Sequence, residues 1–138
     1  MKYEEITSGI LKAAFKVHRI LGFGFLEKVY QNAMVIELEK NGLSVDTEKP
    51  IKVYYDSKVV GEYVADLLVE NKVIIELKAT EELNKKYEVQ LVNYLTATGL
   101  EVGLLLNFSK QSLQYKRKVR TLEKNPVNLV RKFSKLEE

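Results

Sequence analysis

The sequence predicts a single α/β domain with a mixed β-sheet flanked by helices. Hydrophobic residues make up 46% of the 138 residues and charged residues 30%, a balance typical of a folded globular protein. Hydrophobic positions recur every three or four residues near the N-terminus and every second residue in the middle of the chain. The length suits one domain spanning residues 1–138.

Two helices are expected in the N-terminal third. Residues 3–20 carry hydrophobic side chains on one helical face, and Gly22 and Gly24 then interrupt the helix because glycine readily adopts positive φ. Residues 25–40 predict a second helix, which ends at the Asn-Gly pair 41–42. The buried stripe of this second helix is expected to consist of Leu26, Val29, Tyr30, Ala33 and Met34.

A meander of three strands is expected next, over residues 50–55, 59–69 and 73–79. These segments are rich in Val, Ile and Tyr, and the polar residues 56–57 and 70–72 between them are typical of hairpin turns. The third segment is apolar at nearly every position, which favours a central strand covered on both faces.

The C-terminal part predicts a helix over 82–98, a buried strand over 100–108 and an edge strand over 113–119. Pro126 suits the first turn of a closing helix over 126–136. The expected order is therefore helix, helix, meander, helix, strand, strand, helix.

Composition excludes several kinds of site. The chain has no Cys, so it cannot use a disulfide, a thiolate metal site or a Cys nucleophile, and a single His excludes a multi-His zinc site within one chain. No apolar run approaches the roughly 18 residues of a membrane span, and the start lacks the apolar region of a signal peptide. We therefore expect a soluble, cytoplasmic protein.

The net charge of +3 conceals an asymmetry. Residues 1–108 hold 13 basic and 16 acidic side chains (net −3), whereas residues 109–138 hold 9 basic and 3 acidic ones (net +6). An acidic body with a basic C-terminal segment indicates a polyanionic partner, although a solvated charged tail would have the same composition.

Asp66, Glu76 and Lys78 are charged residues inside apolar strands, where an unpaired charge is costly. Glu76 and Lys78 are two residues apart and share a face. A three-residue turn pairs Val69 with Val73, which places Asp66 opposite Glu76 on that face; a slip of one residue would move Asp66 to the other face.

Two interpretations of this cluster remain open. Facing carboxylates repel each other, so a tolerated pair indicates a bound cation, and hard ions such as Mg²⁺ or Mn²⁺ prefer oxygen ligands. Alternatively, Lys78 forms a structural ion pair with Glu76 or Asp66.

The motif Asp66…Glu76-x-Lys78 resembles the D…ExK signature of the PD-(D/E)XK nuclease superfamily. It lies on a meander that follows a helix, as the αβββαβ core of that superfamily requires. Gln90-Leu-Val-Asn-Tyr94 is similar to the QxxxY motif of RecB-type nucleases. The resemblance implies a restriction-endonuclease-like fold with extra N-terminal and C-terminal helices.

Residues 17–33, which include Gly24-Phe-Leu-Glu27-Lys-Val-Tyr30, are similar to the defining segment of the GxxExxY family, small prokaryotic members of the superfamily. The resemblance extends from about residue 4 to 120. The chain departs from the family pattern at Phe23, where Pro is expected between the two glycines.

The resemblance implies a metal site that holds Mg²⁺ or Mn²⁺ through Asp66, Glu76, the backbone carbonyl of Leu77, and Glu27. Lys78 would position or deprotonate the attacking water, or stabilise charge on the phosphate.

Gln90 and Tyr94 are four apart, so they share a helix face and would orient the site or touch the nucleic acid. The alternative is that Tyr94 is a core residue and Gln90 lies at the boundary of the core.

On a strand over 113–119, Lys116, Lys118 and Arg120 would share one face and could contact phosphates. Lysines that protect an edge strand from aggregation would show the same pattern. The sequence also leaves open whether two copies pair as a homodimer.

The leading hypothesis is a metal-dependent nuclease that hydrolyses phosphodiester bonds in DNA by a metal-activated water. The alternative is a non-catalytic module of the same fold that binds nucleic acid or a partner protein.

Overall fold

The computed structural model describes residues 3–120. Its elements, in chain order, are α1 (Glu4–Leu21), α2 (Glu27–Lys40), β1 (Val45–Tyr55), β2 (Lys58–Val69), β3 (Val73–Lys78), α3 (Lys85–Thr98), β4 (Val102–Phe108) and β5 (Leu113–Val119). The closing helix expected over 126–136 lies outside the described residues, as does the end of the basic C-terminal segment.

The strands form one five-stranded sheet in the order β1-β2-β3-β4-β5. Strands β3 and β4 are parallel, and every other neighbouring pair is antiparallel. Helix α3 makes the crossover between the two parallel strands, as parallel pairing requires. The predicted α/β class and mixed sheet are therefore confirmed.

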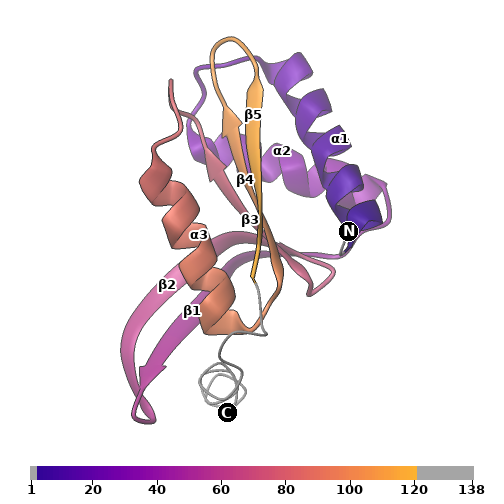
Figure 1. Cartoon of the computed structure of the whole chain (residues 1–138). Coiled ribbons are helices and arrows are strands. Elements are labelled where there is room, and N and C mark those ends of the chain that lie inside the picture. The colour runs from indigo at the N-terminus through magenta and orange to yellow at the C-terminus, as the bar shows by residue number, and fades with distance from the viewer. Residues whose placement is uncertain (1–2, 121–138) are drawn as a thin grey trace.

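Helices cover both faces of the sheet, with α1 and α2 on one face and α3 on the other (Figure 1). Strand β3 supplies both layers of the core: Ile75 and Leu77 pack with α1 and α2, while Ile74 packs with α3. All three side chains are buried, which confirms the central strand predicted from its apolar composition. The β1–β2 hairpin extends beyond the body of the sheet and bends across the end of α3 (Figure 1).

The buried stripe predicted for the second helix was wrong at two positions. Leu26 is 80% exposed and Val29 is 37% exposed, because α2 begins only at Glu27 and turns Tyr30, Met34 and Leu38 toward the core.

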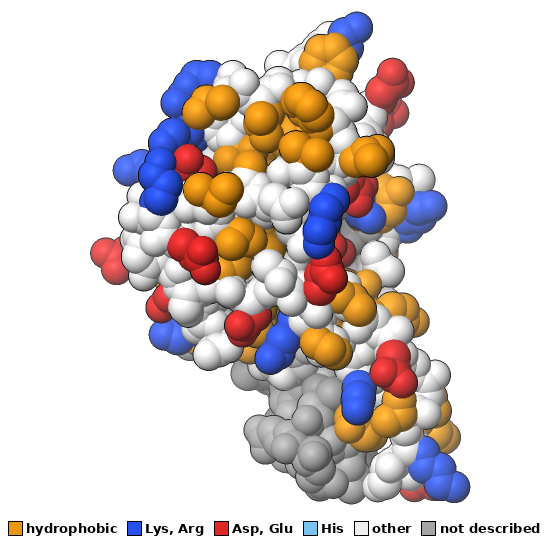
Figure 2. All heavy atoms as spheres, turned by 180° about the vertical axis from the view of Figure 1, so that it is seen from behind, with side chains coloured by type: hydrophobic (Ala, Val, Ile, Leu, Met, Phe, Trp, Pro, Cys, Tyr) orange, Lys and Arg blue, Asp and Glu red, His pale blue; other side chains and the backbone are white. Residues whose placement is uncertain are grey.

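Figure 2 shows hydrophobic side chains gathered on the upper part of the face turned away from the viewer in Figure 1. Basic and acidic side chains are interspersed over the rest of that face.

Strand β1 begins at Val45, earlier than the predicted residue 50. Residues 46–49 are polar and all exposed, so they lack the alternation that marks a strand. Pairing with β2, from Val45 opposite Val69 onward, makes this segment a strand nonetheless.

Gly103 on β4 allows α3 to approach the sheet closely. A Cβ atom there would lie 2.8 Å from Cδ1 and 3.0 Å from Cγ of Leu91, which is fully buried on α3. Any larger residue would therefore displace the helix or the packed leucine.

We expect Gly103→Ala to lower the free energy of unfolding by about 1–3 kcal/mol through overpacking. Gly9→Ala on α1 is the matched control, since its nearest neighbour would be 3.8 Å away. That variant should gain about 0.5–1 kcal/mol because alanine favours a helix. Urea denaturation of the three proteins tests this, and equal stability of the two variants would contradict the packing argument.

Candidate active site

Asp66 and Glu76 lie where the pairing of β2 with β3 ends. The pairs Val69–Val73 and Leu67–Ile75 follow the predicted register, and Leu67–Ile75 is the last pair of the ladder. Beyond it, the backbone N–H of Asp66 donates to Oε1 of Glu76 at 2.9 Å, and the backbone N–H of Leu77 donates to Oδ2 of Asp66 at 2.7 Å. Each carboxylate therefore binds the backbone of the opposite strand in place of a ladder carbonyl.

The alternation of β2 also changes at Asp66. Ala65 and Leu68 both pack with α3 although they are three residues apart, whereas Leu67 packs with α1 and α2. On β1, Glu48 has φ of 50° and lies between the residues paired with Ala65 and Leu67. This local break in the hairpin lets Asp66 reach the end of β3 without displacing core residues.

Burial dominates the electrostatics of the carboxylate pair. Glu76 is only 6% exposed. Burial, followed by the charge of Asp66, raises the pKa of Glu76 to about 8. Burial also raises the pKa of Asp66, against the hydrogen bond from Leu77, which lowers it. The native pair is consequently stabilised when it binds a proton or a cation.

Lys78 does not neutralise the pair by a direct contact. Among the described residues, it forms no salt bridge with Asp66 or Glu76, so the structural ion pair considered above does not form. Its Nζ instead lies over the ring of Tyr87 on α3, 4.2 Å from the centroid. The aromatic ring holds the ammonium group beside the carboxylates, where it lowers the pKa of both.

Glu27 lies in the first turn of α2, and its charge raises the pKa of both carboxyls. The loop before it is held by Tyr30, whose hydroxyl donates to the carbonyl of Gly22 at 2.6 Å and whose ring stacks on Phe108 at 4.4 Å. The bond from Tyr30 to Gly22 therefore fixes the loop that leads to Glu27.

The donor set suits a hard divalent cation, because Glu76 is a buried carboxylate that forms no salt bridge with any residue from 3 to 120, and its neighbours offer oxygen atoms. Within residues 3–120, however, no three His, Cys, Asp or Glu side chains are gathered closely enough to form a complete ligand set. Glu27 is near the pair without joining it.

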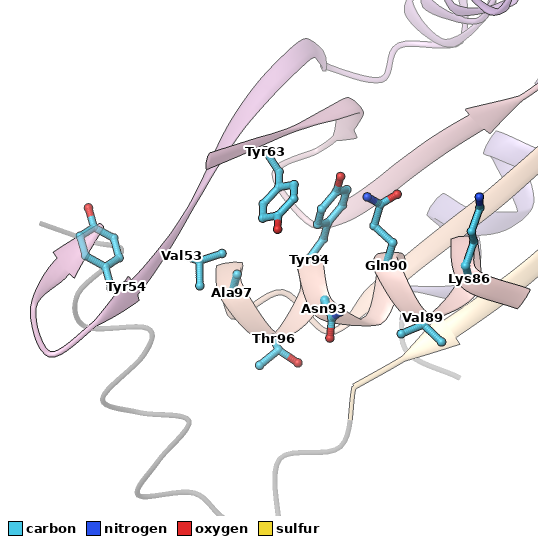
Figure 3. A pocket seen from close by; sticks show the side chains of 10 residues that line it. All are labelled: Val53, Tyr54, Tyr63, Lys86, Val89, Gln90, Asn93, Tyr94, Thr96 and Ala97. Atoms are coloured by element: carbon cyan, nitrogen blue, oxygen red, sulfur yellow. The ribbon is translucent and has the colours of Figure 1, made fainter. Parts of the chain in front are cut away.

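Gln90 and Tyr94 point to the same side of α3, where Tyr94 lies beside Tyr63 of β2 (Figure 3). Tyr94 is buried in the α3 core, and its ring lies 5.6 Å from that of Tyr63. Burial raises the pKa of Tyr94 to about 12, with further contributions from the charges of Glu76 and Asp66. Tyr94 is therefore a core residue, as one of the two alternatives above has it, and it also lies within the electrostatic influence of the carboxylates.

The three predicted phosphate-binding cations have different surroundings. Lys116 is exposed, while Lys118 forms an ion pair with Glu88 at 2.6 Å. Arg120 is buried, and its guanidinium donates to the carbonyls of Leu100 and Gly99 at the end of α3. Arg120 thus fixes the α3–β4 connection in this structure.

Three site residues were missed by the sequence interpretation. Glu48 contacts Lys28 and Gln31 of α2, and its position opposite Asp66 could have been found only by extending the β1 pairing through polar residues. Tyr63 and Tyr87 carry no motif, and their roles depend on how α3 packs against the sheet.

Comparison with known proteins places this geometry in a family. The family model described as the PD-(D/E)XK nuclease superfamily matches residues 4–120. No curated protein matches the sequence.

Solved structures show the same fold. The crystal structure of SSO0001 is similar with a TM-score of 0.56 and 19% identity, covering 99% of this chain and 69% of that one. An alkaline exonuclease (LHK-Exo) from Laribacter hongkongensis is similar with a TM-score of 0.50 and 13% identity, covering 99% and 80%.

In the described part of the chain, no helix is long and apolar enough to span a membrane. Three findings agree on the family: the five-stranded mixed sheet, the carboxylate pair at the end of β2 and β3, and the family match over residues 4–120. The chain belongs to the PD-(D/E)XK nuclease superfamily.

Proposed function

We propose that this protein is a nuclease of the GxxExxY family that hydrolyses phosphodiester bonds in DNA with the help of Mg²⁺ or Mn²⁺. The observation that carries the proposal is the pair formed by buried Glu76 and partly buried Asp66, which lacks a cationic side-chain partner among the described residues. Burying the Glu76 carboxylate beside that of Asp66 is unfavourable unless a proton or a cation neutralises the pair.

In this proposal, Asp66 and Glu76 hold the metal, with the backbone carbonyl of Leu77 and the carboxylate of Glu27 as further ligands. A bound divalent ion would supply a water of lowered pKa and would offset negative charge on the phosphate. The influence of Glu27 on both carboxyls, and the Tyr30 bond that fixes the loop before it, support this role.

Lys78 would orient the attacking water or stabilise charge on the phosphate. Its ammonium group is held over Tyr87 and is not consumed by a salt bridge within residues 3–120, which leaves its donors for a substrate. Gln90 and Tyr94 would orient this site from α3.

Lys116 and Lys118 would contact phosphates from β5, with Lys118 exchanging its ion pair with Glu88 for one with the substrate. Arg120 would support this surface from behind through its bonds to the α3–β4 connection.

One observation favours the second candidate, a non-catalytic module that binds nucleic acid or a partner protein. The described residues contain no assembled group of three metal-ligating side chains. Salt-sensitive DNA binding without cleavage in Mg²⁺ or Mn²⁺ would support this candidate.

Asp66→Asn should abolish metal-dependent cleavage of single-stranded and double-stranded DNA. Loss of residues behind the ligands typically costs roughly 10–100-fold in metal affinity or activity, so loss of a ligand should cost at least about 100-fold. Asp46→Asn, at an exposed position of β1, is the matched control and should cleave like the wild type. Cleavage that survives in Asp66→Asn would refute the assignment of this site.

The metal-free protein should lose stability as the pH rises from about 4.5 to 8. Native Glu76 keeps its proton up to a pKa of about 8, whereas the unfolded chain releases it near 4.5, so the native state binds more protons across this window. Glu76→Gln removes the titrating group and preserves an oxygen acceptor for the N–H of Asp66. The variant should therefore be more stable than the wild type at pH 8 by on the order of 3 kcal/mol, and similar to it near pH 4.

Urea denaturation with a chelator present measures this difference. Added Mn²⁺ should stabilise the wild type at pH 8 but not Glu76→Gln, since a bound ion replaces the proton. A difference between the two proteins that does not change with pH would show that Glu76 is not held in its protonated form.

A further inference from the structure

The proposal so far assigns no ligand to a groove that lies beside the carboxylate pair. It has a volume of about 380 Å³ and runs along α3 where the β1–β2 hairpin bends over the helix (Figure 3). We call it the tyrosine groove; its side chains that matter here are Tyr63, Lys86, Gln90, Asn93 and Tyr94. Tyr94 connects the two places, because it lines the groove and its pKa responds to Glu76 and Asp66.

The aromatic wall of the groove is partly open. Tyr63 is 46% exposed, and its ring is tilted by 48° toward that of Tyr94, with 5.6 Å between the centroids. Figure 3 shows the two rings facing each other from β2 and α3, with Gln90 beside Tyr94. An exposed aromatic face next to a cavity is a suitable platform for another flat ring.

Three polar side chains of the groove have no hydrogen-bond partner within the described residues. The side-chain amides of Gln90 and Asn93 and the hydroxyl of Tyr63 form no hydrogen bond to any residue between 3 and 120. An amide offers a donor and an acceptor together, the combination that recognises the edge of a nucleobase. Rings that stack and amides that recognise edges together fit a base better than an aliphatic ligand.

The positive charge lies at one end of the groove. Lys86 is one helical turn from Gln90, and its Nζ lies 5.4 Å from the centroid of the Tyr87 ring, which also holds Lys78. A base stacked on the exposed face of Tyr63 would thus share the groove with the ammonium group of Lys86. The Tyr87 ring therefore links the basic end of the groove to Lys78 of the candidate active site.

A base inside a duplex cannot enter this groove, because its faces are stacked on its neighbours and its edge is paired. We infer that the tyrosine groove binds one unpaired nucleobase next to the phosphate to be cleaved, so that the protein selects single strands or unpaired ends over intact duplexes. This inference rests on the proposed nuclease function for the chemistry, but the binding that it describes is measurable without cleavage.

The test compares binding of a labelled oligothymidylate with binding of a blunt duplex by fluorescence anisotropy, with Ca²⁺ in place of Mg²⁺. Tyr63→Ala should lose roughly 5- to 150-fold in affinity for the single strand, the range expected for one stacked base, and little for the duplex. Tyr63→Phe keeps the ring and should bind like the wild type. The matched control is Tyr55→Ala, a 75% exposed tyrosine of the same hairpin that does not line the groove.

Asn93→Ala is a second variant that leaves the contact between Tyr63 and Tyr94 intact, and it should weaken single-strand binding selectively. Equal affinities of Tyr63→Ala, Asn93→Ala and Tyr55→Ala for the single strand would overturn the inference. An oligouridylate measured in parallel distinguishes the two sources of the base: a preference for either strand identifies DNA or RNA, and both outcomes retain the groove.

Failure of the inference and failure of the proposed function can be told apart. If Tyr63→Ala selectively loses single-strand binding while the wild type cleaves no substrate, the inferred role of the groove stands and the proposed nuclease function is rejected. If Tyr63→Ala cleaves with the same rate and strand preference as the wild type, the proposed nuclease function stands and the inferred role of the groove is rejected.

Discussion

The structure depends on a pair of carboxylates that no side-chain cation neutralises within the described residues. Asp66 and Glu76 stand at the end of the β2–β3 ladder, where each accepts a hydrogen bond from a backbone N–H. A buried carboxylate beside a partly buried one, with both ionised, costs free energy that a tightly paired ladder would not. This unfavourable pair lies in the centre of the sheet and does not stabilise the fold. Such an arrangement is typical of a functional site that binds a cation.

The surrounding elements fix the parts that must lie near the pair. Tyr30 connects the loop before Glu27 to β4 through its hydroxyl and its stacking on Phe108. Asn107, fully buried on β4, bonds both backbone groups of Thr80 and so holds the chain just beyond Lys78. Rigid strands and a fixed loop thus position the acids and the lysine, while the bent hairpin and α3 leave a groove open beside them.

The sequence was sufficient for features that depend on local spacing. The three-residue turn after Val69 set the register of β2 and β3, and thereby the meeting of Asp66 with Glu76. It was insufficient where a distant contact decides the outcome. Leu26 is exposed because Tyr30 determines how the loop enters α2, and Glu48 approaches Asp66 only because both strands break at the same point. The tyrosine groove arises from the bend of the hairpin over α3, for which the sequence contains no periodic signal.

Charge and stacking have distinct consequences for how a nucleic acid would be held. Several lysines of the described surface already have acidic partners, including Lys16 with Glu37, Lys28 with Glu48, and Lys118 with Glu88. A phosphate must displace those carboxylates, so these lysines contribute less to affinity than free ones, and added salt weakens their contribution further. Stacking of a base on Tyr63 involves no exchange of ions. A strand held by the groove would therefore keep part of its affinity at a salt concentration that releases a duplex, because a duplex cannot place a base on Tyr63 and would depend more on contacts to its phosphates.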